Sequence, residues 1–179
     1  MSETKLRIRI YTVADFYEEE NWLREEHQKG WKLTKMTPPC FYLFEKCEPE
    51  DVIYRLDYKN STGTDDYMQM MQDYEWEYFA QCIGWLYFRK PASRITTENE
   101  GELFSDNASR IDMLQHVIRT RMLPLLIIFL CCVIPNTLKS FDNEFGTIFT
   151  IFWVIMFVIY ALIFIHCGRK LWILKKDLE

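Results

Sequence analysis

The stretch YEWEYFAQCIGWLYFRKP, residues 74–91, resembles an earlier stretch of the same chain, GWKLTKMTPPCFYLFEKC, residues 30–47. Trp31 falls on Trp76 at a separation of 45 residues, and YLFEK falls on LYFRK at a separation of 44. A spacing held this closely indicates an internal duplication. A duplication constrains the fold as a whole, so it is considered before the individual helices and strands are assigned.

Both halves of this duplicated region have the same order of elements. Residues 5–47 read as the strand LRIRIY, a helix, and the strands WKLTKM and FYLFEKC. Residues 51–91 repeat this order as VIYRLDY, a helix, WEYFAQC and WLYFRKP, with LRIRI matching VIYRL 46 residues later. We therefore predict a cytoplasmic α+β domain over residues 1–104, built from a duplicated strand–helix–strand–strand unit. Its simplest form is an antiparallel sheet with both helices on one face.

The strands are aromatic or apolar on both faces. Trp85 and Tyr87 point to one face of their strand, and Leu86 and Phe88 point to the other. One layer of helices covers only one face of a sheet. The second face therefore needs another cover, which is a ligand, a partner, a second copy of the chain or a curl of the sheet.

Charge is distributed unevenly along the 179 residues. Residues 1–105 hold 13 Lys/Arg and 20 Asp/Glu, a net charge of −7, whereas residues 106–179 hold 8 and 6, a net charge of +2. Phosphate repels an acidic domain, so we expect no direct binding of nucleic acid. The six cysteines include no CxxC pair, which fits neither a zinc site nor a disulfide framework and indicates reduced thiols.

Two apolar segments follow the domain. The first, residues 122–138, contains Pro135, which kinks or ends a helix, so a shallow or re-entrant segment is an alternative to a full span. The second, residues 145–167, reaches the length of about 20 apolar residues that a bilayer requires. The predicted organisation is an amphipathic juxtamembrane helix over residues 105–121, a transmembrane hairpin over residues 122–168, and a basic cytoplasmic tail over residues 169–179.

Basic residues flank the two apolar segments, whereas the linker TLKSFDNEF holds a single lysine. The positive-inside rule then places both termini in the cytoplasm of a two-span protein of the cell membrane. The opening MSETKLRIRIY agrees, because it lacks the apolar core of a signal peptide. We expect contacts with membrane lipids at five basic residues of the interface: Arg110, Arg119, Arg121, Arg169 and Lys170.

Signals of catalysis are weak. The three histidines lie in three different regions, and no HExxH, GxSxG, GxGxxG or P-loop motif occurs. The run Glu18 to Glu20 is interpreted as a solvated helix start. We therefore expect no enzyme, no catalytic residue, no metal and no cofactor.

Signals of binding are stronger. Tryptophans sit at related places in the two repeats, with glutamates nearby. Aromatic walls beside a carboxylate suit a cationic amphiphile, through cation–π and charge contacts. The alternative is that the aromatic residues fill the core and the glutamates face solvent. The candidate residues for a ligand or partner are Trp31, Trp76, Trp85, Tyr87, Glu45, Glu75 and Glu77.

The region from about residue 17 to residue 104 resembles a bacterial membrane-protein family, that of domain of unknown function 2812. The resemblance is carried by EEENWLREEHQKGWKL, YLFEKCEPEDVIYRLDY, YMQMMQDYEWEYF, WLYFRKP and ELFSD. It implies two spans after the domain, and a gene neighbourhood that contains regulators similar to the PadR group. The doubled unit is also similar in architecture to gyrase-inhibitor-like multidrug-binding domains, which is a likeness of layout only.

These observations predict a non-enzymatic, membrane-anchored regulatory or sensor protein. Its cytoplasmic domain would bind a protein partner, a PadR-like transcription regulator, with the acidic surface competing with DNA. The alternative is a binding module for a cationic amphiphile or drug, and a structural subunit of a membrane complex is a third option. A homodimer that covers the second aromatic face is also open.

Overall fold

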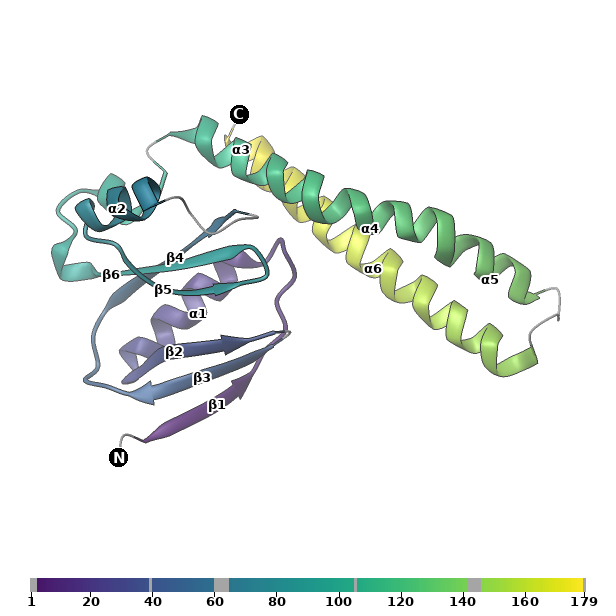
Figure 1. Ribbon diagram of the computed structural model, residues 1–179, viewed down its shortest axis with the longest axis horizontal. Coiled ribbons are helices and arrows are strands. Elements are labelled where there is room, and N and C mark those ends of the chain that lie inside the picture. The colour runs from purple at the N-terminus through teal and green to yellow at the C-terminus, as the bar shows by residue number, and fades with distance from the viewer. Residues whose placement is uncertain (1–2, 39, 60–64, 105, 142–145, 179) are drawn as a thin grey trace. The chain divides into compact units, whose positions relative to one another are not determined.

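The computed structural model describes residues 3–38, 40–59, 65–104, 106–141 and 146–178 (Figure 1). They form two compact units, one ending at Met113 and one beginning at Leu114. The strands are β1 (Thr4–Ile8), β2 (Trp31–Thr37), β3 (Phe41–Lys46), β4 (Val52–Tyr58), β5 (Glu77–Cys82) and β6 (Trp85–Pro91). The helices are α1 (Phe16–Gln28), α2 (Asp65–Asp73), α3 (Asn107–Val117), α4 (Leu123–Ile128), α5 (Ile134–Phe141) and α6 (Gly146–Leu178).

The six strands form two antiparallel sheets of the same topology. Sheet A has the order β1-β3-β2, and sheet B has the order β4-β6-β5. The β2–β3 ladder shifts register between Leu33 and Lys35, and the β5–β6 ladder shifts between Tyr78 and Ala80, 45 residues later. A β-bulge preserved at the separation found in the sequence confirms the predicted duplication of the strand–helix–strand–strand unit.

The first strand of each repeat aligns differently from the sequence match. Arg7 pairs with Tyr42 in sheet A. Leu86, which falls on Tyr42 in the sequence match, pairs with Asp57 in sheet B. Arg7 therefore corresponds to Asp57 rather than to Ile53. A slip of four residues leaves every side chain on the same face of a strand, so alternation alone does not fix this register.

Helix α1 lies between the two sheets. On one side its Trp22 packs edge-on against Tyr42 and Phe44 of sheet A, with ring centroids 5.0 and 5.5 Å apart. On the other side its Phe16 stacks on Trp85 of sheet B at 5.2 Å. Because α1 contacts both sheets, its buried residues form one broad face that is shared between them.

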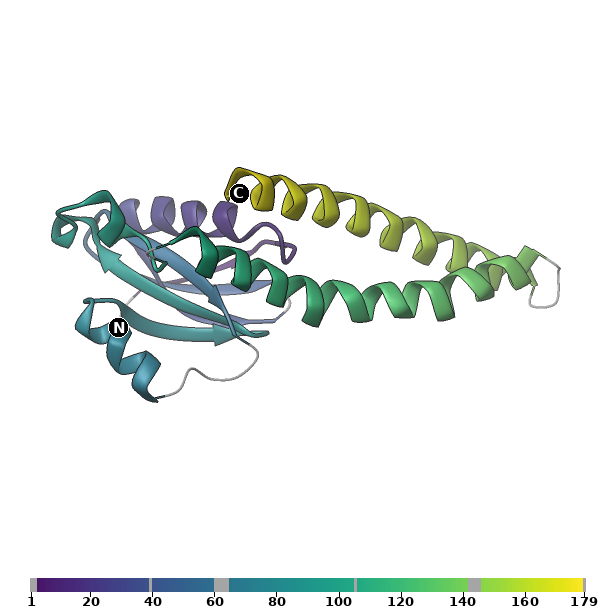
Figure 2. The ribbon, with the colours of Figure 1, turned by 90° about the horizontal axis from the view of Figure 1, so that it is seen from above.

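Helix α2 covers the opposite face of sheet B. Its Met71 packs in a buried cluster with Leu86 and Phe88 of β6. In the first unit α1 therefore lies in the angle between sheets A and B (Figure 1), and the view from above has α1 and α2 on opposite sides of sheet B (Figure 2). The fold class is as predicted, but two sheets form, and the two helices do not share one face of a single sheet.

The two sheets meet along β2 and β5. Arg89 on β6 donates from Nη1 to the carbonyl oxygen of Leu33 on β2, at 3.2 Å, and pairs with both carboxylate oxygens of Glu77. Helix α1 lies in the angle between the two sheets. The second aromatic face of sheet B is thus covered by the helix of the other repeat, which was not among the covers considered from the sequence.

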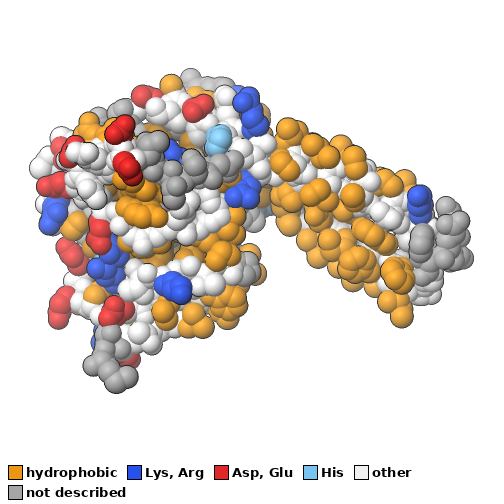
Figure 3. All heavy atoms as spheres, viewed as in Figure 1, with side chains coloured by type: hydrophobic (Ala, Val, Ile, Leu, Met, Phe, Trp, Pro, Cys, Tyr) orange, Lys and Arg blue, Asp and Glu red, His pale blue; other side chains and the backbone are white. Residues whose placement is uncertain are grey.

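Two long helices follow the strands, and the second unit contains them from Leu114 onward. They run from Asn107 to Phe141 and from Gly146 to Leu178, and both are long and apolar enough to cross a membrane. Figure 3 shows hydrophobic side chains over most of the visible surface of α4 to α6, whereas charged side chains gather on the first unit. Residues 105 and 145, where two predicted segments begin, lie outside the described residues.

Pro135 does not end the first apolar helix. A π-helical turn at Phe129–Val133 precedes it, and α5 continues beyond it. Proline removes one backbone donor and displaces the carbonyls of the preceding turn. Two side chains bond to these carbonyls: Asn136 donates to the Cys132 oxygen and Thr137 to the Val133 oxygen, each at 2.7 Å.

Candidate functional site

A buried carboxylate joins the three central layers of the first unit. Glu19 on α1 accepts hydrogen bonds at Oε1 from the Tyr42 hydroxyl of sheet A, at 2.9 Å, and from the Tyr87 hydroxyl of sheet B, at 2.8 Å. Burial raises the pKa of Glu19 from 4.5 to about 7, although the two hydroxyl donors oppose the rise. One side chain of the first repeat therefore holds both sheets through a group that titrates near neutral pH.

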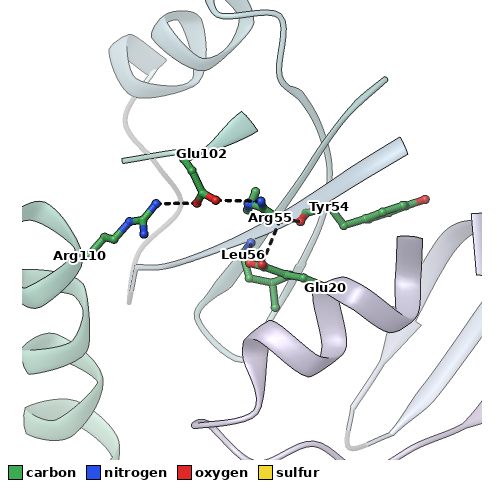
Figure 4. A network of polar contacts seen from close by, with 6 residues as sticks. All are labelled: Glu20, Tyr54, Arg55, Leu56, Glu102 and Arg110. Atoms are coloured by element: carbon green, nitrogen blue, oxygen red, sulfur yellow. Dashed lines mark hydrogen bonds and ion pairs between the residues drawn. The ribbon is translucent and has the colours of Figure 1, made fainter. Parts of the chain in front are cut away.

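The next residue, Glu20, begins a chain of charged contacts. Its Oε1 accepts from the backbone N–H of Leu56 at 2.7 Å, and its Oε2 lies 3.4 Å from Nη1 of Arg55. Burial raises the pKa of Glu20 from 4.5 to about 8, against the attraction of Arg55. Arg55 in turn donates to Glu102 at 3.0 Å, and Glu102 accepts from Arg110 at 2.7 Å (Figure 4).

This relay of Glu20, Arg55, Glu102 and Arg110 links four parts of the first unit. It starts in α1 at the centre of the stack, passes through β4 and the segment before α3, and reaches α3 itself (Figure 4). Arg110 is only 22% exposed at its side chain, and Glu102 is 32% exposed. Ion pairs that are partly withdrawn from solvent are screened less than surface pairs, so the relay connects the buried core to the helix that leads into the first apolar segment.

A pocket lies beside the relay and shares Glu102 with it. Its volume is about 320 Å³, within the range of small-molecule sites. The walls come from α2, the turn between α2 and β5, strand β6, and the segment Glu98–Gly101 with the residues after it. The lining residues are Met70, Met71, Tyr74, Trp76, Lys90, Glu100, Glu102 and Leu103.

The charged groups of this pocket differ in their hydrogen-bond and ion-pair partners. Lys90 is 5% exposed and its ammonium donates to the Tyr74 carbonyl oxygen at 3.1 Å, with the Trp76 ring 5.9 Å away. Among the ion pairs of the described residues, none includes Lys90. Glu102 is paired with two arginines, and Glu100 accepts from the backbone and hydroxyl of Thr96.

The predicted binding aromatics do not form one site. Trp85 and Tyr87 are buried, at 8% and 1% exposure, on the face of sheet B that α1 covers. Trp76 is buried on the α2 side and lines the pocket. Trp31 is half-buried at the start of β2, with the Lys5 ammonium 4.8 Å from its ring centre. Of these four aromatic residues, Trp76 lines this pocket and the other three do not.

The predicted carboxylates are likewise dispersed. Glu77 is engaged by Arg89, and Glu45 lies half-buried on β3 opposite Lys32. Glu75 is exposed, with a φ of +63°. None of the three lines the pocket, and the carboxylates that do are Glu100 and Glu102.

The predicted membrane-interface residues differ in exposure. Arg110 belongs to the relay, whereas Arg119 and Arg169 are exposed and Arg121 and Lys170 are half-buried in the second unit.

Among the residues that the structure describes, no group of three or more His, Cys, Asp or Glu could hold a metal ion.

Glu19 and Glu20 correct the interpretation of the acidic run as solvated. Glu18 is exposed, but Glu19 and Glu20 are 6% and 3% exposed. A helix in the angle between two sheets buries a broader face than a helix on a single sheet, and the prediction of one helical layer on one sheet did not allow for this. The available signal was the unassigned cover of the second aromatic face, whereas Lys90 and Glu102 lie in the quoted stretches WLYFRKP and ELFSD but had no binding role predicted from the sequence.

The chain thus consists of an α+β unit of two stacked repeats followed by two long apolar helices. The family model described as "Protein of unknown function (DUF2812)" matches residues 15–129, which is more than half of the chain, and the protein belongs to that family. No match was found among curated proteins, and none among solved structures.

Proposed function

We propose that this chain is a non-enzymatic, membrane-anchored regulatory protein whose first unit binds a protein partner. The observation that carries the proposal is the outer face of sheet A, the face turned away from α1. Leu6, Ile8 and Phe41 on this face are 58%, 63% and 38% exposed, and Leu43 beside them is half-buried. Contiguous apolar side chains on a sheet face mark an interaction surface.

The duplication indicates what this face accepts. Phe41 and Leu43 of sheet A correspond to Trp85 and Tyr87 of sheet B. In sheet B the equivalent face is buried beneath α1. The outer face of sheet A therefore has the position and apolar character of a surface that already takes a helix in this fold, and the proposed occupant is an amphipathic helix of the partner.

The proposed partner is a PadR-like transcription regulator, which is the context that the family resemblance implies. The net charge of −7 over residues 1–105 favours encounter with a basic, DNA-binding protein. Membrane anchoring rests on the two long apolar helices. The distribution of Lys and Arg around them supports cytoplasmic termini, which would put the first unit in the compartment of such a regulator.

The test uses the full chain in lipid nanodiscs, a PadR-like regulator of the same organism and the operator DNA of that regulator. Wild-type protein is expected to release the regulator from labelled operator DNA at low salt. The double variant Leu6→Lys, Ile8→Lys should weaken this by at least about tenfold, because two charges enter an apolar contact. Ile83→Asn is the control, since Ile83 is 51% exposed on the β5–β6 turn of sheet B and is not part of the outer face of sheet A.

Two outcomes would contradict the proposal. If the regulator binds its operator DNA equally well with and without the wild-type protein, a PadR-like regulator is not the partner. If native mass spectrometry shows a homodimer of the wild type that becomes a monomer in the double variant, the outer face binds a second copy of the chain instead of a regulator.

A second candidate function is small-molecule binding, which the pocket beside Trp76 favours. Its volume and its mixture of apolar and charged walls are those of a ligand site. A structural role in a membrane complex remains as the third option, and it is the outcome if neither a regulator nor a ligand binds.

A further inference from the structure

The pocket at Trp76 contains a charge arrangement that points to its ligand. One wall is apolar, formed by Met70 and Met71 of α2, Trp76, and Leu103. Its charged groups are the Lys90 ammonium and the carboxylates of Glu100 and Glu102. Apolar walls with a few converging polar groups bind the body of a small molecule and fix its orientation.

Lys90 supplies a site for an anion. Its side chain comes from the α2 face of β6, and the residue is 5% exposed. An ammonium carries three donors, and the Tyr74 carbonyl accepts from one of them. A buried cation is stable when it is paired with an anion, and Lys90 has no carboxylate within 4.0 Å among the described residues.

Glu100 and Glu102 supply a site for a cation in the same pocket. The hydrogen bonds from Thr96 lower the pKa of Glu100, so its carboxylate is ionised at neutral pH. Glu102 is already the acceptor for Arg55 and Arg110, and its remaining acceptor capacity is available to a ligand donor. Neither carboxylate lies within ion-pair distance of Lys90.

We infer that this pocket binds a zwitterionic small molecule with an apolar body. Its anionic group pairs with Lys90, its ammonium with Glu100 and Glu102, and its apolar body lies along Trp76, Met70 and Met71. A ligand with one charge alone satisfies one side and meets the like charge of the other. The inference is independent of partner binding at the outer face of sheet A, and it replaces a purely cationic amphiphile with a zwitterion.

Three matched probes separate the possible charge requirements. Phenylalanine carries both charges, phenethylamine carries the ammonium alone, and 3-phenylpropionate carries the carboxylate alone, all on the same ring. The full chain in phosphatidylcholine nanodiscs, labelled with 5-fluorotryptophan, reports binding through the ¹⁹F resonance of Trp76, assigned by its loss in Trp76→Phe. Phenylalanine should shift this resonance saturably, and each single-charge probe should bind at least about tenfold more weakly.

Variants assign each charge to its residue. Lys90→Met should abolish the preference for phenylalanine over phenethylamine, because the like charge is removed. Glu100→Gln should abolish the preference over 3-phenylpropionate, and it keeps the test valid if Lys90→Met fails to fold. Asp73→Asn is the control, since Asp73 is exposed on α2 and is not among the residues that line the pocket.

The outcomes divide as follows. Preferential binding of phenylalanine, lost in the two variants and kept in the control, supports the inference. If phenethylamine binds as tightly as phenylalanine, the ligand is a cation and the inference is wrong. If 3-phenylpropionate binds as tightly as phenylalanine, the ligand is an anion and the inference is also wrong. No saturable shift with any probe also overturns it. Repeating the titration in phosphatidylglycerol nanodiscs distinguishes sources. A zwitterionic lipid headgroup in the pocket would block phenylalanine in phosphatidylcholine, whereas phosphatidylglycerol, whose headgroup carries no cation, would let it bind.

Discussion

Sheets A and B share one topology but differ in how they are covered. Sheet B has α1 on one face and α2 on the other, and residues 85–90 of β6 are all buried. Sheet A has α1 on one face and solvent on the other, where Ile8 is 63% exposed. Stacking two copies of a sheet-and-helix unit leaves the first sheet without an outer layer, so the difference arises from position in the stack rather than from a difference in the strands.

The same stacking explains the chemistry of α1. Helix α2 covers a sheet on one side, and Met71 is its one buried residue among those described. Helix α1 is held between two sheets, which brings Glu19, Glu20 and His27 into the interior. Burial moves their pKa values in the directions that favour the neutral forms: Glu19 to about 7, Glu20 to about 8 and His27 to about 4.

The largest predicted effect compares corresponding residues of the two sheets. Trp85→Ala should reduce the free energy of unfolding by roughly 3–5 kcal/mol, because it opens a cavity against Phe16 and Tyr58. Phe41→Ala, at the corresponding position of sheet A, should cost less than about 1.5 kcal/mol, since Phe41 is 38% exposed. Urea unfolding of the full chain in detergent, followed by circular dichroism, measures both. Equal losses would mean that the outer face of sheet A is covered in solution.

The second prediction concerns the carboxylate that joins the sheets. The folded pKa of Glu19, about 7, lies above its usual 4.5. The stability linked to this shift is therefore fully present below about pH 4.5 and is lost as the pH rises through 7. Glu19→Gln should match wild type near pH 5 and should be more stable at pH 8, by up to about 3 kcal/mol.

The measurement is the difference in unfolding free energy between Glu19→Gln and wild type at several pH values. Glu20 and His27 are present in both proteins, which removes most of their own pH dependence from the difference. This matters because His27 acts in the opposite sense: its pKa is lowered from 6.5 to about 4, so its contribution is lost as the pH falls through that window. A difference that is constant from pH 5 to pH 8 would show that Glu19 titrates at its ordinary value.

Much of the fold could be predicted from the sequence because the repeat signal lies in the hairpins. Trp31 and Trp76 keep their separation of 45 residues, and the bulge between Leu33 and Lys35 recurs at the same separation. Hydrophobicity and length were enough to predict two apolar helices. These features depend on local spacing, which a single sequence records.

The stacking of the repeats and the site could not be predicted in the same way. Whether Glu19 faces solvent or lies between two sheets depends on long-range packing, and alternation in the strands is compatible with either arrangement. The candidate site depends on Lys90, Glu100 and Glu102, which come from different elements and have no shared motif. Trp76 was among the predicted binding residues, but Trp85 and Tyr87 were equally good candidates by sequence and are core residues.

The smallest predicted effect tests whether the two repeats share their helix-to-strand turn. Gly30 has a φ of +82°, and Glu75, 45 residues later, has a φ of +63°. Each donates its N–H three residues back along the chain, Gly30 to His27 and Glu75 to Gln72, at 2.8 Å in both repeats. The turn geometry is thus the same although the residue differs, and a non-glycine residue in this left-handed region carries a conformational strain of order 1 kcal/mol.

Glu75→Gly should therefore raise the free energy of unfolding by about 0.5–1 kcal/mol, the strain relieved less the added freedom of glycine in the unfolded chain. Gly30→Ala should have the opposite sign and a larger size, because a Cβ there meets the Cys47 carbonyl oxygen at 3.0 Å in addition to the strained φ. Thermal unfolding of both variants, with the exposed Glu50→Gln as a control for the change of charge, measures the pair. A loss of stability in Glu75→Gly would mean that the glutamate side chain makes a stabilising contact that outweighs its strain, and that the two turns, alike in backbone, are held differently.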